Sequence, residues 1–344
     1  MQNPHTYKLA CLISGRNFGD ALIQSIFLKQ LINRGFSEKY IVWTRPESAI
    51  FFSDIPNCKV ITSFFPVGTN KKVNWAGLRS LLSAVRILRS QSIDVTLDMF
   101  GDIRERCLAF MISSKSHKYI GWSVGHQFNK NIRNFFGQGR PVCFINKEKI
   151  NIYDAYQSFV NVLTNNHANN CELSTKPIIS EGLLKIGLHP FASQECRLWP
   201  SEKWIELAQT LVHRGHHITV YGAPSEHSKI ESIFGKQATM IRFFTGSIPE
   251  FINDLTTIDI LVGLDSFSVH IASHIGLKTI VISGASHPEM WAPPNSEVVF
   301  SSGGCPHYPC MNKPKCRGTN FEYSCIKTVE VNSILRMLDK TIMK

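Results

Sequence analysis

The sequence predicts an α/β protein made of two Rossmann-like domains. Three observations lead to this class: a length of 344 residues, a composition of 43% hydrophobic and 18% charged residues, and short apolar runs that alternate with amphipathic runs. A chain of this length exceeds what one hydrophobic core usually serves, and its composition leaves little for extended disorder. Strands that alternate with helices favour parallel, doubly wound sheets.

The first half of the chain opens on a strand, a glycine turn and a helix. The apolar run "YKLACLISG" reaches "GRNFGD" and gives way to "ALIQSIFLKQLINRG", whose apolar spacing is helical and which closes on Gly35. Further strands are expected in "YIVWT", "CKVITSF" and "IDVTLDM", and helices in "LRSLLSAVRILRS", "DIRERCLAFMISS" and "IYDAYQSFVNVLT". These elements place a first domain at residues 1–165.

A polar segment at residues 166–182 is the predicted linker to a second series of elements. Strands are expected in "LLKIGLHP", "HITVYG", "MIRFFTG", "DILVGL" and "TIVISG", and helices in "EKWIELAQTLVHRG", "PSEHSKIESIF", "IPEFINDLTTI" and "SFSVHIASHIG". This series places a second domain at residues 183–325, and residues 326–344 are expected to form a terminal helix.

The charge of the chain bears on its partners. Thirty-seven Lys and Arg against 26 Asp and Glu give a net charge of +11, which favours a polyanionic partner: a nucleotide, a phosphorylated glycolipid, an anionic membrane or nucleic acid. No arginine-rich arm and no zinc-finger or RNP-type signature occurs, so we expect no nucleic acid. No apolar run approaches the ~18 residues of a membrane span, and "KLACLISG" is too short for a signal-peptide core. We therefore expect a cytoplasmic protein.

Asp20 and Asp265 each stand just after an expected strand and just before an expected helix. Ligands in open α/β sheets bind at the carboxyl ends of the strands, so the expected site is a cleft between the two domains. A second interpretation is helix capping, because Asp directly before an apolar helical run is a preferred N-cap residue. From the residues alone, capping is the favoured interpretation of Asp20.

An ordered series of short stretches resembles glycosyltransferase family 9, the lipopolysaccharide heptosyltransferases. The series is "FGDAL", "DMFGDIRE", "GLHPFAS" with "RLWPSEKW", "VYGAPSE", "FTGSIPEF", "VGLDSFSVHIA" and "SGASHPEMWAPP". The resemblance implies a GT-B fold, with an acceptor-side domain and a nucleotide-sugar domain facing each other across a cleft. It also implies inverting transfer of a sugar, usually heptose from ADP-heptose, to the inner core of lipopolysaccharide in bacteria.

The resemblance also implies roles for individual residues. Asp20 matches the family's proposed general base, the group that takes the proton of the acceptor hydroxyl. Arg197 stands where the family usually has Lys, and it keeps the positive charge. Together with Ser266, Ser268 and the helix N-terminus that follows Asp265, Arg197 is expected to hold the departing diphosphate. Asp265 itself is expected to accept hydrogen bonds from donor hydroxyls.

Two further matches and two departures complete the implied donor site. His270 matches a family histidine, with a core histidine as the open alternative, and Glu226 is a candidate for the nucleotide ribose, with a solvated surface carboxylate as its alternative. Phe191 and Phe267 stand where the family commonly has glycine, which lets backbone approach a ligand closely. We expect these two rings to narrow the donor site or to require another donor.

Metal chemistry is not expected in the transfer step. The sequence has neither an Asp-x-Asp, whose carboxylates would hold a cation on the diphosphate, nor a Walker-type phosphate loop, so no catalytic cofactor is expected. Cys305, Cys310, Cys316 and Cys325 fall in one loop-rich stretch. They could surround a structural zinc or iron ion, as some related autotransporter heptosyltransferases bind iron, but reduced thiols are the favoured interpretation.

The expected function is thus glycosyl transfer, with a nucleotide-diphosphate sugar as donor and a glycolipid or oligosaccharide as acceptor. Peripheral contact with the anionic inner face of a bacterial inner membrane would suit the basic surplus. Three alternatives stay open: a relative that uses another nucleotide sugar or a protein acceptor, a sugar-nucleotide epimerase of similar architecture, and a catalytically silent nucleotide-binding scaffold. Donor hydrolysis would separate the scaffold from the enzymes.

Overall fold

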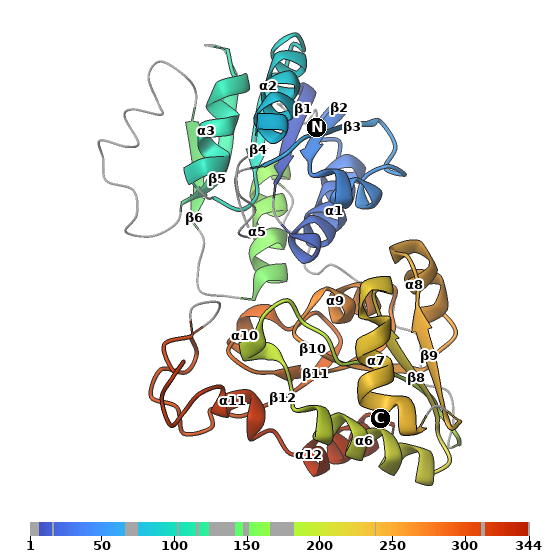
Figure 1. Cartoon of the computed structure of the whole chain (residues 1–344). Coiled ribbons are helices and arrows are strands. Elements are labelled where there is room, and N and C mark those ends of the chain that lie inside the picture. The colour runs from blue at the N-terminus through green and yellow to red at the C-terminus, as the bar shows by residue number, and fades with distance from the viewer. Residues whose placement is uncertain are drawn as a thin grey trace. The chain divides into compact units, whose positions relative to one another are not determined.

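The structure is a computed structural model that divides into two compact units, Met1–Cys171 and Glu172–Lys344 (Figure 1). Each unit contains a six-stranded parallel sheet, so the predicted α/β class is confirmed. The predicted linker lies outside the described residues except for its last residue. The structure describes residues 7–15, 17–65, 75–101, 103–114, 117–123, 142–146, 151–165, 182–237, 239–310 and 314–342.

The sheet of the first unit has the strand order β3-β2-β1-β4-β5-β6. The chain therefore builds outward from β1 to one edge, returns to the middle and builds outward from β4 to the other edge. The strands are β1 (Tyr7–Ser14), β2 (Ser37–Thr44), β3 (Cys58–Thr62), β4 (Val95–Asp98), β5 (Lys118–Ser123) and β6 (Val142–Asn146), and the helices are α1 (Phe18–Asn33), α2 (Trp75–Arg89), α3 (Ile103–Ile112) and α5 (Ile152–Thr164).

Apolar patterning explains how this unit packs. The middle of β1 is fully buried, as expected of a central parallel strand. α1 is buried on nearly all sides and packs against α5, whereas α2 buries one face against the sheet and exposes the other. α1 begins at Phe18, ahead of the expected start at Ala21.

The sheet of the second unit has the order β12-β11-β10-β7-β8-β9, which is the same topology. Its strands are β7 (Lys185–His189), β8 (His217–Gly222), β9 (Ile241–Thr245), β10 (Ile260–Leu264), β11 (Lys278–Ser283) and β12 (Ser296–Phe300). Its helices are α6 (Ser201–His213), α7 (His227–Phe234), α8 (Ile248–Leu255), α9 (Phe267–His274), α10 (Pro288–Trp291), α11 (Ser324–Lys327) and α12 (Val331–Ile342).

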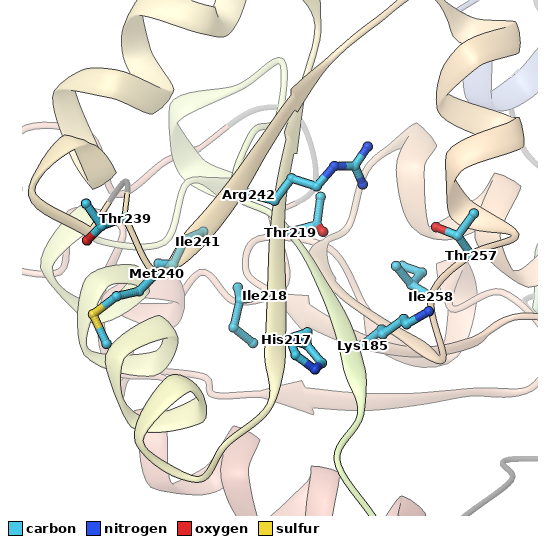
Figure 2. A pocket seen from close by; sticks show the side chains of 10 residues that line it. All are labelled: Lys185, His217, Ile218, Thr219, Thr239, Met240, Ile241, Arg242, Thr257 and Ile258. Carbon is cyan, nitrogen blue, oxygen red and sulfur yellow. The ribbon is translucent and has the colours of Figure 1, made fainter.

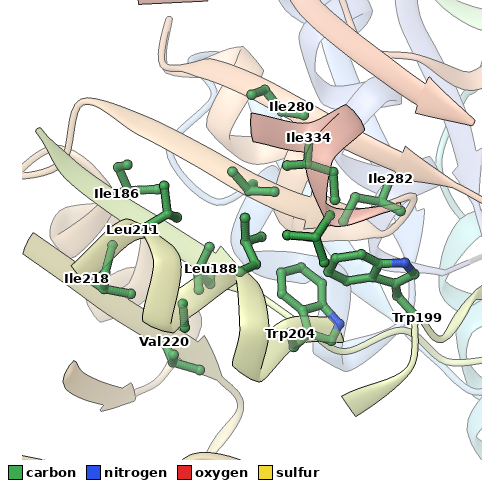
Figure 3. Packing of buried hydrophobic residues seen from close by; sticks show 14 of the residues in the cluster. Ile186, Leu188, Trp199, Trp204, Leu211, Ile218, Val220, Ile280, Ile282 and Ile334 are labelled. Atoms are coloured by element: carbon green, nitrogen blue, oxygen red, sulfur yellow. The ribbon is translucent and has the colours of Figure 1, made fainter. Parts of the chain in front are cut away.

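The core of the second unit lies between its sheet, α6 and α12 (Figure 3). Trp199 and Trp204 pack edge to face, with ring centroids 5.1 Å apart, and both are buried. The indole N–H of Trp199 donates to the carbonyl of Val329 at 2.9 Å, which ties the C-terminal segment to this core. α12 begins at Val331, and Ile334 lies among the core residues. No helix in the described part of the chain is long and apolar enough to cross a membrane.

Candidate active site

The strand order of the second unit defines where a ligand would bind. β7 and β10 are hydrogen-bonded neighbours, but the chain leaves β7 toward β8 and leaves β10 toward β11. The loops that follow these two strands therefore diverge at their carboxyl ends. Such a topological switch point is where open α/β sheets form their ligand crevice.

Arg197 and Asp265 meet at this switch point. Arg197 ends the short 3₁₀ helix η3 (Glu195–Arg197) after β7, and Asp265 directly follows β10. The Nη1 atom of Arg197 donates to the main-chain oxygen of Asp265 at 3.0 Å and lies 3.6 Å from its carboxylate Oδ2. The Arg197 side chain is 18% exposed and that of Asp265 is 8% exposed. Two predicted donor-site residues from distant segments are thus brought into contact.

His270 lies on the other side of the same carboxylate. Its Nε2 atom is 4.0 Å from Oδ1 of Asp265, and its side chain is buried on α9. Burial lowers the pKa of His270, the Asp265 charge opposes this effect, and the Arg197 charge adds to it. The imidazole is therefore neutral at pH 7, and Asp265 lies between a cation and a neutral histidine.

Ser266, rather than Asp265, is the N-cap residue of α9, so the capping interpretation of Asp265 is wrong. The helix begins at Phe267, one residue later than capping by Asp265 would require. The hydroxyl oxygens of Ser266 and Ser268 lie 3.0 Å apart. A helix N-terminus carries partial positive charge and main-chain N–H donors. This end of α9 can therefore bind an anion beside Arg197.

The remaining residues considered for the donor site lie after β8 (Glu226), in the core (Phe191) and at the start of α9 (Phe267). Glu226 follows β8, and its carboxylate accepts a hydrogen bond from the main-chain N of Ala223, in its own turn, at 2.8 Å. Phe191 is buried in the core cluster, where its ring packs against Gly222. The bulk of Phe191 is therefore taken up by the core, whereas Phe267 is partly exposed at the first position of α9.

His189 also lies in this region, and the sequence did not predict its lowered pKa. It ends β7, and its ring lies 6.2 Å from the ring of Phe191 and 6.0 Å from that of Phe251. Burial lowers the pKa of His189 to about 4. The sequence feature that could have drawn attention to His189 is its position in "GLHPF", at the end of an apolar strand.

Acid should destabilise the protein through His189. In the unfolded chain a histidine has a pKa of about 6.5. Between that pH and the lower pKa of the folded state, His189 is therefore protonated in the unfolded chain but neutral in the folded protein. The stability present above pH 6.5 falls as the pH drops, and the loss levels off below the folded pKa near 4. The cost reaches about 3 kcal/mol. Urea unfolding of the wild type and His189→Asn between these pH values should show a steeper decline in the wild type, and equal slopes would contradict this.

In the first unit, the corresponding switch point lies between β1 and β4. Asp20 follows β1 in the first turn of α1 and is partly buried. The N-cap residue is Asn17, so the capping interpretation of Asp20 is wrong because the helix starts before it. Tyr156, on α5, is an electrostatic neighbour: burial and then the charge of Asp20 raise its pKa well above 10. Tyr156 therefore keeps its proton.

Two side-chain hydrogen bonds hold the carboxyl end of β1. The Nε atom of Arg45 donates to the carbonyl of Gly15 at 2.6 Å, and the hydroxyl of Thr44 donates to the carbonyl of Ser14 at 2.8 Å. A side chain at position 15 would overlap the ring of Phe65, so the turn requires glycine there. These contacts hold the carboxyl end of β1 in place.

A buried polar cluster lies at the carboxyl end of β4, at the same switch point. Asp98 is fully buried and accepts hydrogen bonds from the hydroxyl of Tyr119 at 2.6 Å and from the main-chain N atoms of Gly101 at 2.8 Å and Phe100 at 3.0 Å. Arg106, also fully buried, has its Nε atom 3.9 Å from Oδ2 of Asp98. The sequence marked this region by "DMFGDIRE" but did not predict that Asp98 and Glu105 are buried.

The four C-terminal cysteines are free thiols in this structure. Cys305, Cys316 and Cys325 are buried and Cys310 is partly buried. Burial raises the pKa of Cys325 to about 11 and also raises that of Cys310, so both keep their protons. Among the residues that the structure describes, no three Cys, His, Asp or Glu side chains are placed to hold a metal ion.

A pocket of about 480 Å³ opens at the amino ends of β7, β8 and β9 (Figure 2). Lys185, His217 and Ile241, the first residues of these strands, line it. Arg242, also in its lining, is paired with Asp254 at 2.6 Å. Ligands of parallel sheets bind at the other, carboxyl ends of strands, so we place the active site at the switch points.

Two Rossmann-like units, each with a six-stranded parallel sheet of the same topology, are the architecture of GT-B glycosyltransferases. The family model of glycosyltransferase family 9 (heptosyltransferase) matches residues 81–319, and the chain belongs to this family. It is therefore a glycosyltransferase. No curated protein matches the sequence.

Solved structures match nearly the whole chain. A family 9 glycosyltransferase from Veillonella parvula has a TM-score of 0.74 at 14% identity, with 98% of each chain covered. ADP-heptose lipopolysaccharide heptosyltransferase II from E. coli has a TM-score of 0.66 at 13% identity, with 98% of each covered. The iron-containing dodecameric glycosyltransferase TibC from E. coli has a TM-score of 0.56 at 14% identity, with 98% of this chain and 76% of TibC covered. Identities this low show the shared fold alone.

Proposed function

We propose that the protein transfers heptose from ADP-heptose to a hydroxyl of a lipopolysaccharide core or a related glycan, with inversion and without a metal ion. The observation that carries this proposal is the meeting of Arg197, Asp265 and His270 beside the N-terminus of α9. Similar E. coli heptosyltransferase structures contain ADP or ADP-2-deoxy-2-fluoro heptose, which supports an ADP-linked donor. We therefore also propose that the reaction takes place in the bacterial cytoplasm.

The second unit holds the donor in this proposal. Its diphosphate lies against the Arg197 guanidinium, whose planar fork suits phosphate oxygens, and against the N-terminus of α9 with Ser266 and Ser268. Asp265 repels phosphate but accepts hydrogen bonds from donor hydroxyls. Arg197 donates to its main-chain oxygen and lies 3.6 Å from its carboxylate Oδ2. Glu226, which follows β8, accepts a hydrogen bond from the nucleotide ribose in this proposal.

The first unit supplies the base. The acceptor oxygen forms a bond to the anomeric carbon while the bond from that carbon to the diphosphate oxygen breaks. The acceptor proton passes to the Asp20 carboxylate, and the bonding electron pair leaves with the diphosphate. Positive charge preorganised around the leaving group lowers the barrier, because negative charge develops there in the transition state. A single displacement on the far face of the sugar inverts the anomeric centre.

Acceptor-dependent release of ADP tests this function. Purified protein should release ADP from ADP-heptose when heptose-deficient lipopolysaccharide is present, and should release far less without it. Release without acceptor would indicate a donor hydrolase, and failure with every member of a nucleotide-sugar panel would indicate a silent scaffold. Turnover of another nucleotide sugar, or of a protein acceptor, would keep the chemistry and change the substrate.

Phe267 is the residue expected to set how tightly the donor fits. Its ring stands at the first position of α9, between Ser266 and Ser268. Replacing Phe267 with Ala should remove contact area with the donor and raise the donor KM by about 10-fold. The effect on kcat should be small, as for a group that binds the ground state and the transition state equally. Phe191→Ala is the matched comparison, because that ring packs in the core. It should lower stability by about 3–5 kcal/mol instead. An unchanged KM in Phe267→Ala would contradict this placement.

A further inference from the structure

The positive charge of the chain belongs to one unit. Residues 1–171 contain 21 Lys and Arg against 10 Asp and Glu, whereas residues 172–344 contain 16 of each kind. The first unit therefore carries the whole net charge of +11, and the second is neutral. Such asymmetry favours a polyanionic partner at the first unit, while the donor site belongs to the second.

α2 shows where this partner would bind. Its outward stripe contains two exposed apolar side chains, Trp75 (79% exposed) and Leu82 (51% exposed). Arg79, Arg86 and Arg89 follow the same stripe, because spacings of three and four residues share one helix face. The opposite face of α2 is buried against the sheet, so the stripe is not needed for the core.

The charges on this stripe are of one sign. α2 contains no Asp or Glu, and among the residues that the structure describes none of its three exposed arginines is paired with a carboxylate. The neighbouring helix α3 contacts α2 and lies beside it in Figure 1. It adds Ile103 (44% exposed) and Met111 (37% exposed). The outer faces of α2 and α3 thus combine apolar and cationic side chains.

We propose that this surface, the outer faces of α2 and α3, docks on an anionic lipid bilayer. Arginines interspersed with tryptophan and leucine are typical of helices that lie in the membrane interface, where the cations meet lipid phosphates and the apolar groups enter the acyl boundary. Nucleic acid would use the arginines but would leave Leu82 and Met111 without a role. The inference does not depend on which donor sugar is used, and it would bring the enzyme to a lipid-anchored acceptor.

Trp75 gives a direct signal for docking. Of the six tryptophans, Trp43, Trp122, Trp199 and Trp204 are buried and Trp291 is partly buried, whereas Trp75 is mostly exposed. Vesicles of phosphatidylcholine with about 30% phosphatidylglycerol should shift the tryptophan fluorescence emission of the protein to shorter wavelength. Brominated lipids in these vesicles should quench that fluorescence. The Trp75→Ala variant should lose both responses. Quenching that persists in this variant would overturn the proposal.

Sedimentation with the same vesicles tests the arginines. The double variant Arg79→Glu and Arg86→Glu should bind at least about 10-fold more weakly than the wild type. The matched control, Lys229→Glu with Lys236→Glu, makes the same change in net charge at exposed positions of the second unit and should bind like the wild type. Equal losses in the two variants would mean that only total charge matters, and would overturn the proposal. Binding of a DNA duplex but not of vesicles, or burial of Trp75 in a concentration-dependent dimer without lipid, would overturn it too.

Discussion

Replacing Asp20 with Asn is expected to lower kcat by about 10²–10⁴-fold, the range for a general acid or base, and to leave the Kd of the donor unchanged. Asn fills the same space in the first turn of α1 but cannot take the acceptor proton. The measurement is acceptor-dependent ADP release, together with titration of ADP into each protein. Loss of donor binding in parallel with kcat would contradict the assignment, because it would indicate a role in folding or in binding the donor.

The chain offers a close control for this variant. Asp154 occupies the third position of α5, as Asp20 occupies the third position of α1, and it is exposed. Asp154→Asn removes the same favourable interaction with a helix N-terminus, which is typically 0.3–1 kcal/mol. It should therefore cost a similar small amount of stability and leave kcat unchanged. A similar loss of activity in the two variants would mean that Asp20 acts through the helix rather than as a base.

Replacing Arg197 with Ala is expected to give the second large loss, about 10²–10³-fold in kcat, as for removal of one preorganised group facing developing negative charge. Donor affinity should also fall, because the ground-state diphosphate is already charged. Arg197→Lys, which restores the residue usual in the family, should recover most of the activity while losing the bidentate geometry. Steady-state kinetics with varied donor concentration separates the two effects.

Arg242 provides the control for Arg197. It belongs to the same unit and forms a two-bond ion pair with Asp254 at 2.6 Å and 2.9 Å, but it lies at the opposite, amino end of the strands. Arg242→Ala should change stability slightly and leave donor affinity intact. If both arginine variants lost donor binding equally, the placement of the diphosphate at the switch point would be wrong.

The sequence predicted the fold best where a clear apolar pattern marks both a strand and the helix that follows it. Alternating apolar and amphipathic runs predicted β1, β7 and β10 with the helices that follow them, and hence the turns that bear Asp20, Arg197 and Asp265. It did not predict β5, β6 or β12. β6 and β12 are edge strands, and β12 is largely half-exposed, so its apolar pattern is weak. Helix starts were also imprecise, which made both aspartates look like N-cap residues.

The contacts between distant segments could not be predicted. Arg197 touches Asp265 because β7 and β10 are neighbours in the sheet, and no local pattern specifies that pairing. Phe191 looked like an obstruction at the donor site because its position in the sequence follows a strand end, yet its ring is buried in the core. The sequence also gave no sign that Asp98 and Arg106 form a buried ion pair, because charged residues are mostly exposed.

Calorimetric titration of ADP into the wild type, Arg197→Ala and Asp20→Asn is the most direct test that the second unit's switch point is the donor site. We predict that ADP binds the wild type and Asp20→Asn with equal affinity, and that Arg197→Ala binds at least about 10-fold more weakly, since a charged hydrogen-bond partner of phosphate is lost. Equal binding by Arg197→Ala, or no binding of ADP to the wild type, would contradict the proposed donor site.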